Sequence, residues 1–121
     1  MAATGLSTNK QEYRQRLDEQ TDERIDGWAA ELMRDMSIRL GVRKVLSELR
    51  HAMKVDDAAL TRLFTAGGGP AAAVGKTADG ELMVPAISLR YLVPGARALL
   101  PDARAKLTDY LVEAFDELVY I

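Results

Sequence analysis

The sequence contains no cysteine and a single histidine among its 121 residues. The lack of cysteine excludes a disulfide framework, a thiolate zinc site and a cysteine nucleophile, and it fits a reducing cytoplasm. A lone histidine weakens any Ser-His-Asp interpretation, and the chain has no G-x-S-x-G motif. We therefore expect a non-enzymatic protein with no catalytic residues, no metal site and no cofactor.

Long apolar runs are also missing. No stretch approaches the roughly 20 apolar residues that span a bilayer, and the first residues lack the charged and apolar regions of a signal peptide. We therefore expect a cytoplasmic protein with no membrane partner. The hydrophobic content of 48% and the charged content of 28% are typical of a globular chain. The length predicts one α-rich domain over residues 9–121, preceded by a flexible N-terminus at 1–8.

Charge is distributed unevenly along the chain. Residues 1–35 carry five Lys/Arg and eight Asp/Glu, residues 36–106 carry eleven and six, and residues 107–121 carry none and four. A basic middle therefore lies between two acidic ends. Either the ends pack on the middle and neutralise it, or the middle binds an anion.

A long amphipathic helix is predicted over residues 9–36, beginning with Asn9 as its N-cap. Its apolar face recurs at spacings of three and four residues, through Tyr13, Leu17, Thr21, Ile25, Trp28, Leu32 and Met36. This stripe is longer than one small core needs, so it predicts a homodimer. The residues expected in the dimer interface are Tyr13, Leu17, Ile25, Trp28, Leu32 and Met36. The alternative is that the stripe packs on the protein's own C-terminal helix.

Two shorter amphipathic helices are predicted between residues 42 and 66, separated from the first by Gly41. Val55 and Asp56 form a short turn between them, and Asp56 is a suitable N-cap. Gly67 ends the second helix. The apolar residues that would hold the pair together are Leu46, Leu49, Met53, Val55, Leu60 and Leu63.

After Pro70, the segments AAAVGKT and ELMVPAI predict a β-hairpin. Asp79-Gly80 is a favoured two-residue turn, and Pro85 indicates that the second arm is an edge strand or bends there. Alternating apolar residues at 87–93 predict another half-buried strand, Pro94-Gly95 a turn, and residues after Pro101 an amphipathic C-terminal helix. The predicted fold is mainly α with a small β-hairpin. The alternative is a helical bundle in which 71–93 is mostly irregular or pairs across subunits.

The pattern of residues 46–64, followed by a hairpin that would be the wing, resembles the winged helix-turn-helix superfamily. That resemblance implies binding of double-stranded DNA, with the second helix in a groove and basic side chains on phosphates. Two positions depart from the pattern: Arg50 stands where a small residue is usual, and Lys54 where glycine is usual. Asp56 and Asp57 also add negative charge. The candidate DNA-binding residues are Arg43, Lys44, Lys54, Thr61, Arg62 and Lys76.

Three other patterns are weaker. Residues 70–77, PAAAVGKT, nearly match a phosphate-binding loop, but Pro70 replaces the required glycine, so we interpret them as a hairpin arm. Glu48 and His51 form one E-x-x-H, and a di-iron bundle needs two. The acidic residues of 18–26 are best interpreted as a solvated helix face.

Two functions remain. The first is a small DNA-binding transcription regulator of the winged helix-turn-helix type. The second is a protein-interaction, adaptor or assembly subunit that does not bind nucleic acid. The basic middle favours the first. The overall acidity and the departures at Arg50 and Lys54 favour the second.

Overall fold

The computed structural model describes the backbone of residues 6–120 and the side chains of residues 10–115. Over these residues the chain is mainly α-helical with one small antiparallel hairpin, which confirms the predicted fold class. Its α-helices are α1 (Leu6–Asp18), α2 (Asp22–Leu40), α3 (Val42–Met53), α4 (Asp57–Ala66), α5 (Leu92–Leu99) and α6 (Ala103–Tyr120). Its strands are β1 (Gly75–Lys76) and β2 (Leu82–Met83), with short 3-10 helices η1 (Ala71–Ala73) and η2 (Ala86–Tyr91).

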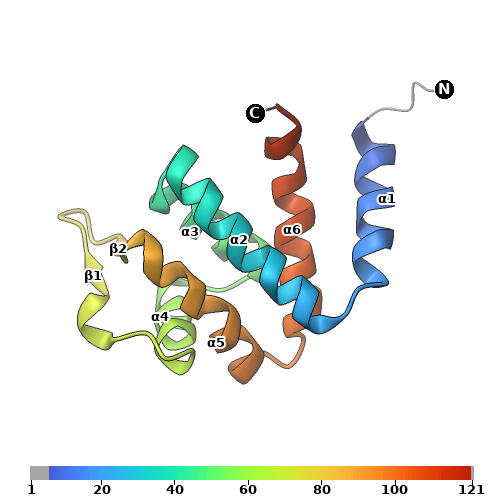
Figure 1. Cartoon of the computed structure of the whole chain (residues 1–121). Coiled ribbons are helices and arrows are strands. Elements are labelled where there is room, and N and C mark those ends of the chain that lie inside the picture. Colours follow the sequence, from blue (N-terminus) through green and yellow to red (C-terminus); the bar gives the residue numbers. More distant parts are fainter. Residues whose placement is uncertain (1–5, 121) are drawn as a thin grey trace.

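Helix α6 lies at the centre of the helical layer and contacts α1, α2 and α3 (Figure 1). The hairpin, α4 and α5 form the other end of the molecule, where α4 packs mainly against α5. Both ends of the described chain lie on the same side of the molecule (Figure 1). Among the described residues, no helix combines the length and apolarity that a membrane crossing requires.

The predicted long N-terminal helix is in fact two helices. Thr21 adopts an extended conformation and its side-chain oxygen accepts a hydrogen bond from the Arg24 backbone N–H at 3.2 Å, so it is the N-cap of α2. Asp22 and Glu23 in the first turn favour a helix start there, because carboxylates interact well with a helix N-terminus. Helix α1 begins at Leu6, so Asn9 lies inside it and is not its cap. Of the predicted flexible N-terminus, residues 1–5 fall outside the described residues.

Most of the stripe predicted as a dimer interface is buried within one protomer. Leu17, Ile25, Leu32 and Met36 are buried in the core, and the Tyr13 ring stacks on Phe115 of α6 with centroids 5.1 Å apart. Trp28, at 38% exposure, is the member that reaches the surface. The alternative, packing against the C-terminal helix, describes these side chains better.

The predicted strand at 87–93 is wrong. Residues Ala86–Tyr91 form η2 and residues Leu92–Leu99 form α5. The buried hydrophobic side chains here are Leu89, Leu92, Val93 and Ala96, which follow a helical spacing that the alternation at 87–93 concealed.

The predicted turn at Pro94-Gly95 also lies inside α5. Pro94 is the third residue of that helix, where a backbone N–H has no partner within the helix, so proline costs nothing there. Gly95 is required by packing. A Cβ atom at this position would lie 1.7 Å from the backbone oxygen of Leu63 in α4.

Two polar side chains stand out in the helical layer. Arg104 of α6 donates hydrogen bonds to the backbone oxygens of Leu17 and Gln20, at 2.9 and 2.7 Å, and to Asp22 at 2.7 Å. It therefore fixes the turn between α1 and α2.

Tyr110 of α6 is fully buried, and its hydroxyl has no hydrogen-bond partner. Burial raises the pKa of this phenol well above its ordinary value.

Candidate nucleic-acid interface

Helices α3 and α4 are joined by a three-residue turn whose backbone explains one of the departures from the helix-turn-helix pattern. Lys54 ends α3 in the left-handed conformation, with φ 57°, which is the conformation that usually selects glycine. Its backbone N–H and that of Val55 both point to the Arg50 carbonyl. Asp56 then caps α4, because its carboxylate accepts a hydrogen bond from the Ala59 N–H at 2.8 Å. Lysine thus performs the role of glycine in the turn.

The second departure is explained by an ion pair. The Arg50 guanidinium donates to Asp57 at 2.7 Å, so it joins the last turn of α3 to the first turn of α4. Both side chains are about one third exposed, at 33% and 37%. The pair neutralises Asp57, one of the two aspartates whose negative charge would oppose the approach of DNA to α4.

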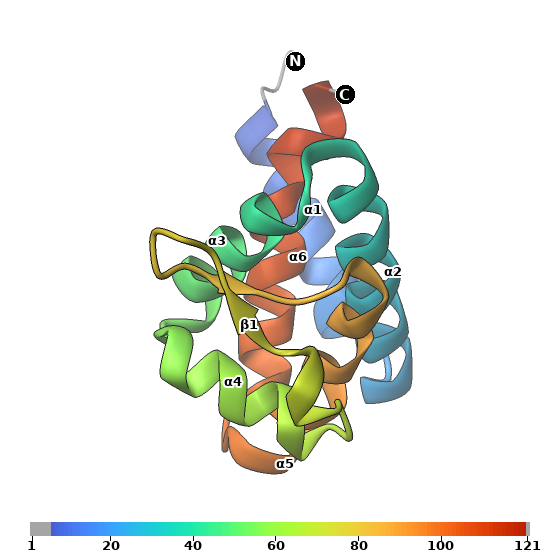
Figure 2. The same cartoon turned by 90° about the vertical axis from the view of Figure 1, so that its left-hand side faces the viewer.

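The hairpin lies across α3 and α4 (Figure 2). Val74, Leu82 and Val84 share one apolar contact region with Leu46, Leu60 and Phe64, and this region has no room for a water molecule. Gly75 pairs with Met83 and Lys76 with Leu82. The elements thus follow one another as helix, turn, helix and hairpin, and the hairpin packs directly on both helices.

The hairpin loop is longer than predicted. The Thr77 N–H donates to the Glu81 carbonyl at 2.8 Å, which leaves three loop residues and not two. Gly80 has φ 85°, as expected after a type I turn in a three-residue loop. The interpretation of PAAAVGKT as a hairpin arm is only partly right, because Gly75–Lys76 form the first arm whereas Ala71–Ala73 form the 3-10 helix η1.

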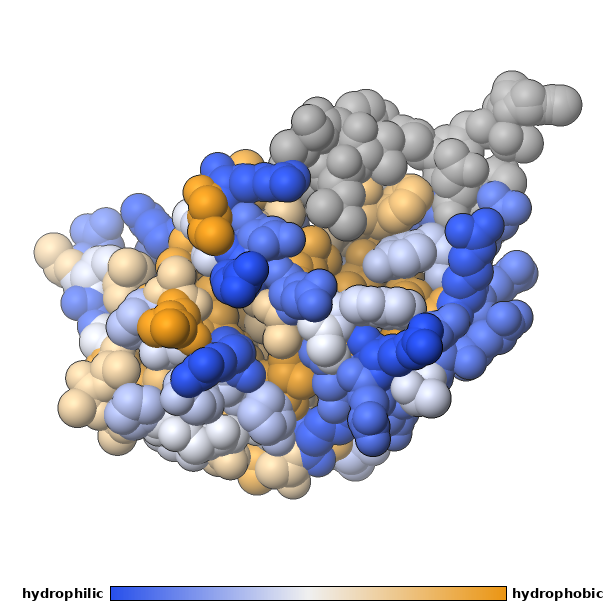
Figure 3. Space-filling model, in the orientation of Figure 1, coloured by the Kyte–Doolittle hydropathy of each residue, from blue (hydrophilic) through white to orange (hydrophobic). Residues whose placement is uncertain are grey.

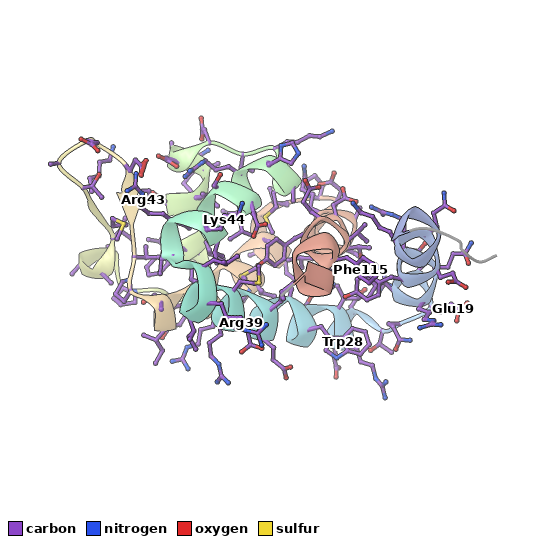
Figure 4. The ribbon with its side chains drawn as sticks, turned by 90° about the horizontal axis from the view of Figure 1, so that it is seen from above. Glu19, Trp28, Arg39, Arg43, Lys44 and Phe115 are labelled. Atoms are coloured by element: carbon purple, nitrogen blue, oxygen red, sulfur yellow. The ribbon has the colours of Figure 1, made fainter. Side chains whose placement is uncertain are left out.

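Arg43 fixes the hairpin tip to α3. Its guanidinium lies 2.7 Å from the Glu81 carboxylate. The hydrogen bond from Arg43 lowers the pKa of Glu81, and the same hydrogen bond raises the pKa of Arg43. Arg43 is still 64% exposed. It lies beside the hairpin, whereas Lys44 lies farther from the hairpin on α3, and Arg39 and Trp28 lie along the opposite edge (Figure 4).

Three of the remaining candidate residues lie on the outer surface of the same unit, and the fourth, Thr61, lines the apolar region between the hairpin and the two helices. Lys54, Arg62 and Lys76 are exposed and form no ion pair among the described residues. Thr61 is half-buried, and its hydroxyl donates to the Asp57 carbonyl at 2.9 Å, so its hydrogen is used within α4. Its oxygen still has a free lone pair. The sequence therefore identified a set that lies on α3, the turn, α4 and β1.

The acidic ends of the chain pair with a different group of basic residues. Asp26 and Asp22 of α2 lie 2.8 and 2.7 Å from Arg97 and Arg104, and Asp109 of α6 lies 2.9 Å from Arg14. The hydrogen bond to Arg104 is the main reason that the pKa of Asp22 is lowered. Within the described part of the chain, the ends thus neutralise cations on α1, α5 and α6 and leave Arg62 of α4 and Lys76 of β1 without an ion pair.

Neither the E-x-x-H pattern nor any other cluster forms a metal site among the described residues. Glu48 is 8% exposed, whereas the His51 side chain is 75% exposed and lies 3.3 Å from Glu113 of α6. The two residues point to different environments.

Sequence reasoning missed a second surface feature. A hollow of about 270 Å³ lies between α2 and η2, lined by Ala30, Glu31, Arg34, Ala86, Ile87, Leu89 and Arg90. Ile87 is 70% exposed, and Ile38, one turn beyond Arg34, is 74% exposed. The sequence did carry one signal of this exposed surface, because the apolar Ile38 does not belong to the stripe of the first predicted helix.

Comparison with known proteins adds no assignment: the chain matches no family model, no curated protein and no solved structure at a significant level.

Proposed function

We propose that this protein is a small, non-enzymatic DNA-binding regulator, with α4 as the groove helix and the β1–β2 hairpin as the wing. The observation that carries the proposal is the packing of the hairpin on both α3 and α4 through Val74, Leu82 and Val84. This packing holds Arg62 and Lys76 in a fixed relation to each other. A fixed relation is what phosphate contacts need in order to set the register of a protein on a duplex.

The outer face of α4 also suits close approach to a duplex. Its exposed side chains include Ala58, Arg62, Thr65 and Ala66, which are small apart from the one arginine. Phosphate contacts would come from Lys54 before the helix and Lys76 on the wing, with Lys44 and Arg43 beside them. Three or four such contacts predict weak binding that depends strongly on salt.

The proposal is tested by fluorescence anisotropy with labelled duplex DNA of random sequence. We expect binding at 50 mM salt that weakens by roughly 40- to 150-fold at 200 mM salt, because each of three or four phosphate contacts adds roughly 0.9 to the slope of log K against log salt. The double variant Arg62→Gln/Lys76→Gln should have a slope smaller by about two.

The matched control is Arg16→Gln/Arg24→Gln, which removes the same charge from exposed positions on α1 and α2. It should leave the slope unchanged. Equal losses in the two double variants would show a net-charge effect and would remove the proposed interface. Absence of binding at 50 mM salt would refute DNA binding.

A second candidate function is protein interaction or assembly without nucleic acid. The observation that favours it is the pair of highly exposed isoleucines, Ile38 at the end of α2 and Ile87 in η2. A homodimer, and a location in the cytoplasm, belong to both proposals. Because the Tyr13–Met36 stripe is mostly buried, we place the dimer contact on the C-terminal part of α2, where Ile38 and Leu40 are exposed. Light scattering on the wild type and on Ile38→Ser tests this, since the substitution should yield a monomer.

A further inference from the structure

We infer that the hollow between α2 and η2 binds a small monocarboxylate with a short apolar body. This site shares no residue with the proposed DNA-binding surface, and the inference does not depend on DNA binding. The hollow offers arginine side chains to the carboxylate of such a ligand and apolar side chains to its body.

The floor of the hollow is apolar, because the buried Leu89 of η2 lines it. Ala30 of α2 and the exposed Ala86 and Ile87 of η2 complete the apolar lining. The volume of about 270 Å³ is slightly below the range of sites for drug-sized ligands, so it suits a molecule of about eight to ten non-hydrogen atoms. Seen from this side, hydrophobic side chains over the end of α2 and over the start of the η2 segment stand among hydrophilic ones (Figure 3).

The walls carry two arginines from different elements. Arg34 comes from α2 and Arg90 from η2, and both line the hollow. Neither forms an ion pair among the described residues, although Arg14, Arg97 and Arg104 all do. Unpaired guanidinium groups beside an apolar floor favour a carboxylate, whose two oxygens match the planar array of N–H donors.

Arg90 is held in place on its own element. Its guanidinium carbon lies 5.1 Å from the centroid of the Tyr91 ring, and one of its nitrogens donates to the Tyr91 hydroxyl at 3.2 Å. Because a guanidinium has five N–H groups, several donors remain for a ligand. Glu31 lies on the same rim, so the net charge of the site is positive by one, which selects a single carboxylate over a dicarboxylate.

The probe is hexanoate, with hexanamide as the uncharged molecule of the same skeleton. Amide chemical shifts in ¹⁵N-labelled protein should show saturable binding of hexanoate with a Kd on the order of 1 mM, as expected for a ligand of this size. The shifts should concentrate at residues 30–34 and 86–90. Hexanamide should bind at least fivefold more weakly.

Two variants separate the charge from the shape of the site. Arg34→Gln/Arg90→Gln should weaken hexanoate binding at least tenfold and leave hexanamide unchanged. Ala86→Phe fills the hollow while keeping both arginines, and it should abolish binding of both molecules. Arg62→Gln on α4 is the control and should bind hexanoate like the wild type.

The inference is overturned if hexanoate causes no saturable shifts, if shifts appear elsewhere, or if hexanamide binds equally well. It is also overturned if the folded double variant, judged by its dispersed amide spectrum, binds hexanoate like the wild type. Because the DNA experiment uses α4 and β1 variants, failure of one proposal is distinguishable from failure of the other.

Discussion

Replacing Tyr110 by phenylalanine should stabilise this protein at neutral pH. The side chain is fully buried on α6 and its hydroxyl has no hydrogen-bond partner, so folding removes that hydroxyl from water without compensation. An unpaired buried polar group of this kind costs about 1–3 kcal/mol. The missing oxygen leaves a cavity of about 10 Å³, which reduces this gain in stability by only about 0.2 kcal/mol. We therefore expect the free energy of unfolding to rise by about 1–2 kcal/mol.

The same substitution should change how stability depends on alkaline pH. Because burial raises the pKa of Tyr110, the phenol ionises more readily in the unfolded chain than in the folded one. The wild type therefore keeps its full stability below the ordinary tyrosine pKa of about 10 and loses it as the pH rises above that value, by about 1.4 kcal/mol at pH 11. The phenylalanine variant lacks this loss. Burial also raises the pKa of Tyr13, but Tyr13 is present in both proteins and cancels in the difference.

Urea unfolding followed by circular dichroism at pH 7 and pH 11 measures both effects. The stability difference between variant and wild type should be positive at pH 7 and larger by about 1.4 kcal/mol at pH 11. Tyr91→Phe, at a half-buried position on η2, is the control for general effects of alkali. A variant less stable than the wild type by more than about 1 kcal/mol at pH 7 would refute the reasoning, since it would require a favourable hydroxyl contact.

Further predictions concern close packing, the guanidinium at the α1–α2 turn, and acid pH. Gly95→Ala should destabilise the protein by about 3 kcal/mol or more in urea unfolding, because the added Cβ would overlap backbone atoms of α4, whereas Gly27→Ala in α2, with nothing within 4 Å, should stabilise it by about 0.5–1 kcal/mol. Arg104→Lys should lower the thermal midpoint and should increase hydrogen exchange of α1, because an ammonium group does not reproduce the several directed hydrogen bonds of the guanidinium; an unchanged midpoint would contradict this. Since its arginine partners lower the pKa of Asp22, the wild type should lose stability as the pH falls below about 4, and Asp22→Asn should lose less over the same range; equal pH profiles would exclude this contribution.

The helices and the hairpin could be predicted because their signals are local. Asp56 as an N-cap, Gly41 and Gly67 as helix ends, and the Asp79-Gly80 turn act within a few residues. The break at Thr21 was missed because the apolar spacing continues across it, with both helices packing on α6. Residues 87–93 were mistaken for a strand because an alternating run also contains the spacing of a short helix.

The candidate site was harder to predict, since it depends on pairings between distant residues. Arg43 and Lys76 are near the helix pair in the sequence, but the sequence does not reveal that Glu81 pairs with Arg43 or that Asp57 pairs with Arg50. Likewise, the charge segments predicted that acidic ends and a basic middle could neutralise each other. Which cations are neutralised depends on how α2 packs against α5 and α6 and how α1 packs against α6.

The central position of α6 also has a consequence for biosynthesis. Helices α1, α2 and α3 all precede α6 in the chain, and each of them packs against it. Until α6 has left the ribosome, the apolar faces of these three helices lack their common partner, so the nascent chain exposes them to other molecules. Completion of the core therefore depends on contacts of long sequence separation, which slow folding relative to a helical hairpin. The protein should acquire its protease resistance in one step, when α6 becomes available for packing, and not gradually as α1 to α3 are synthesised.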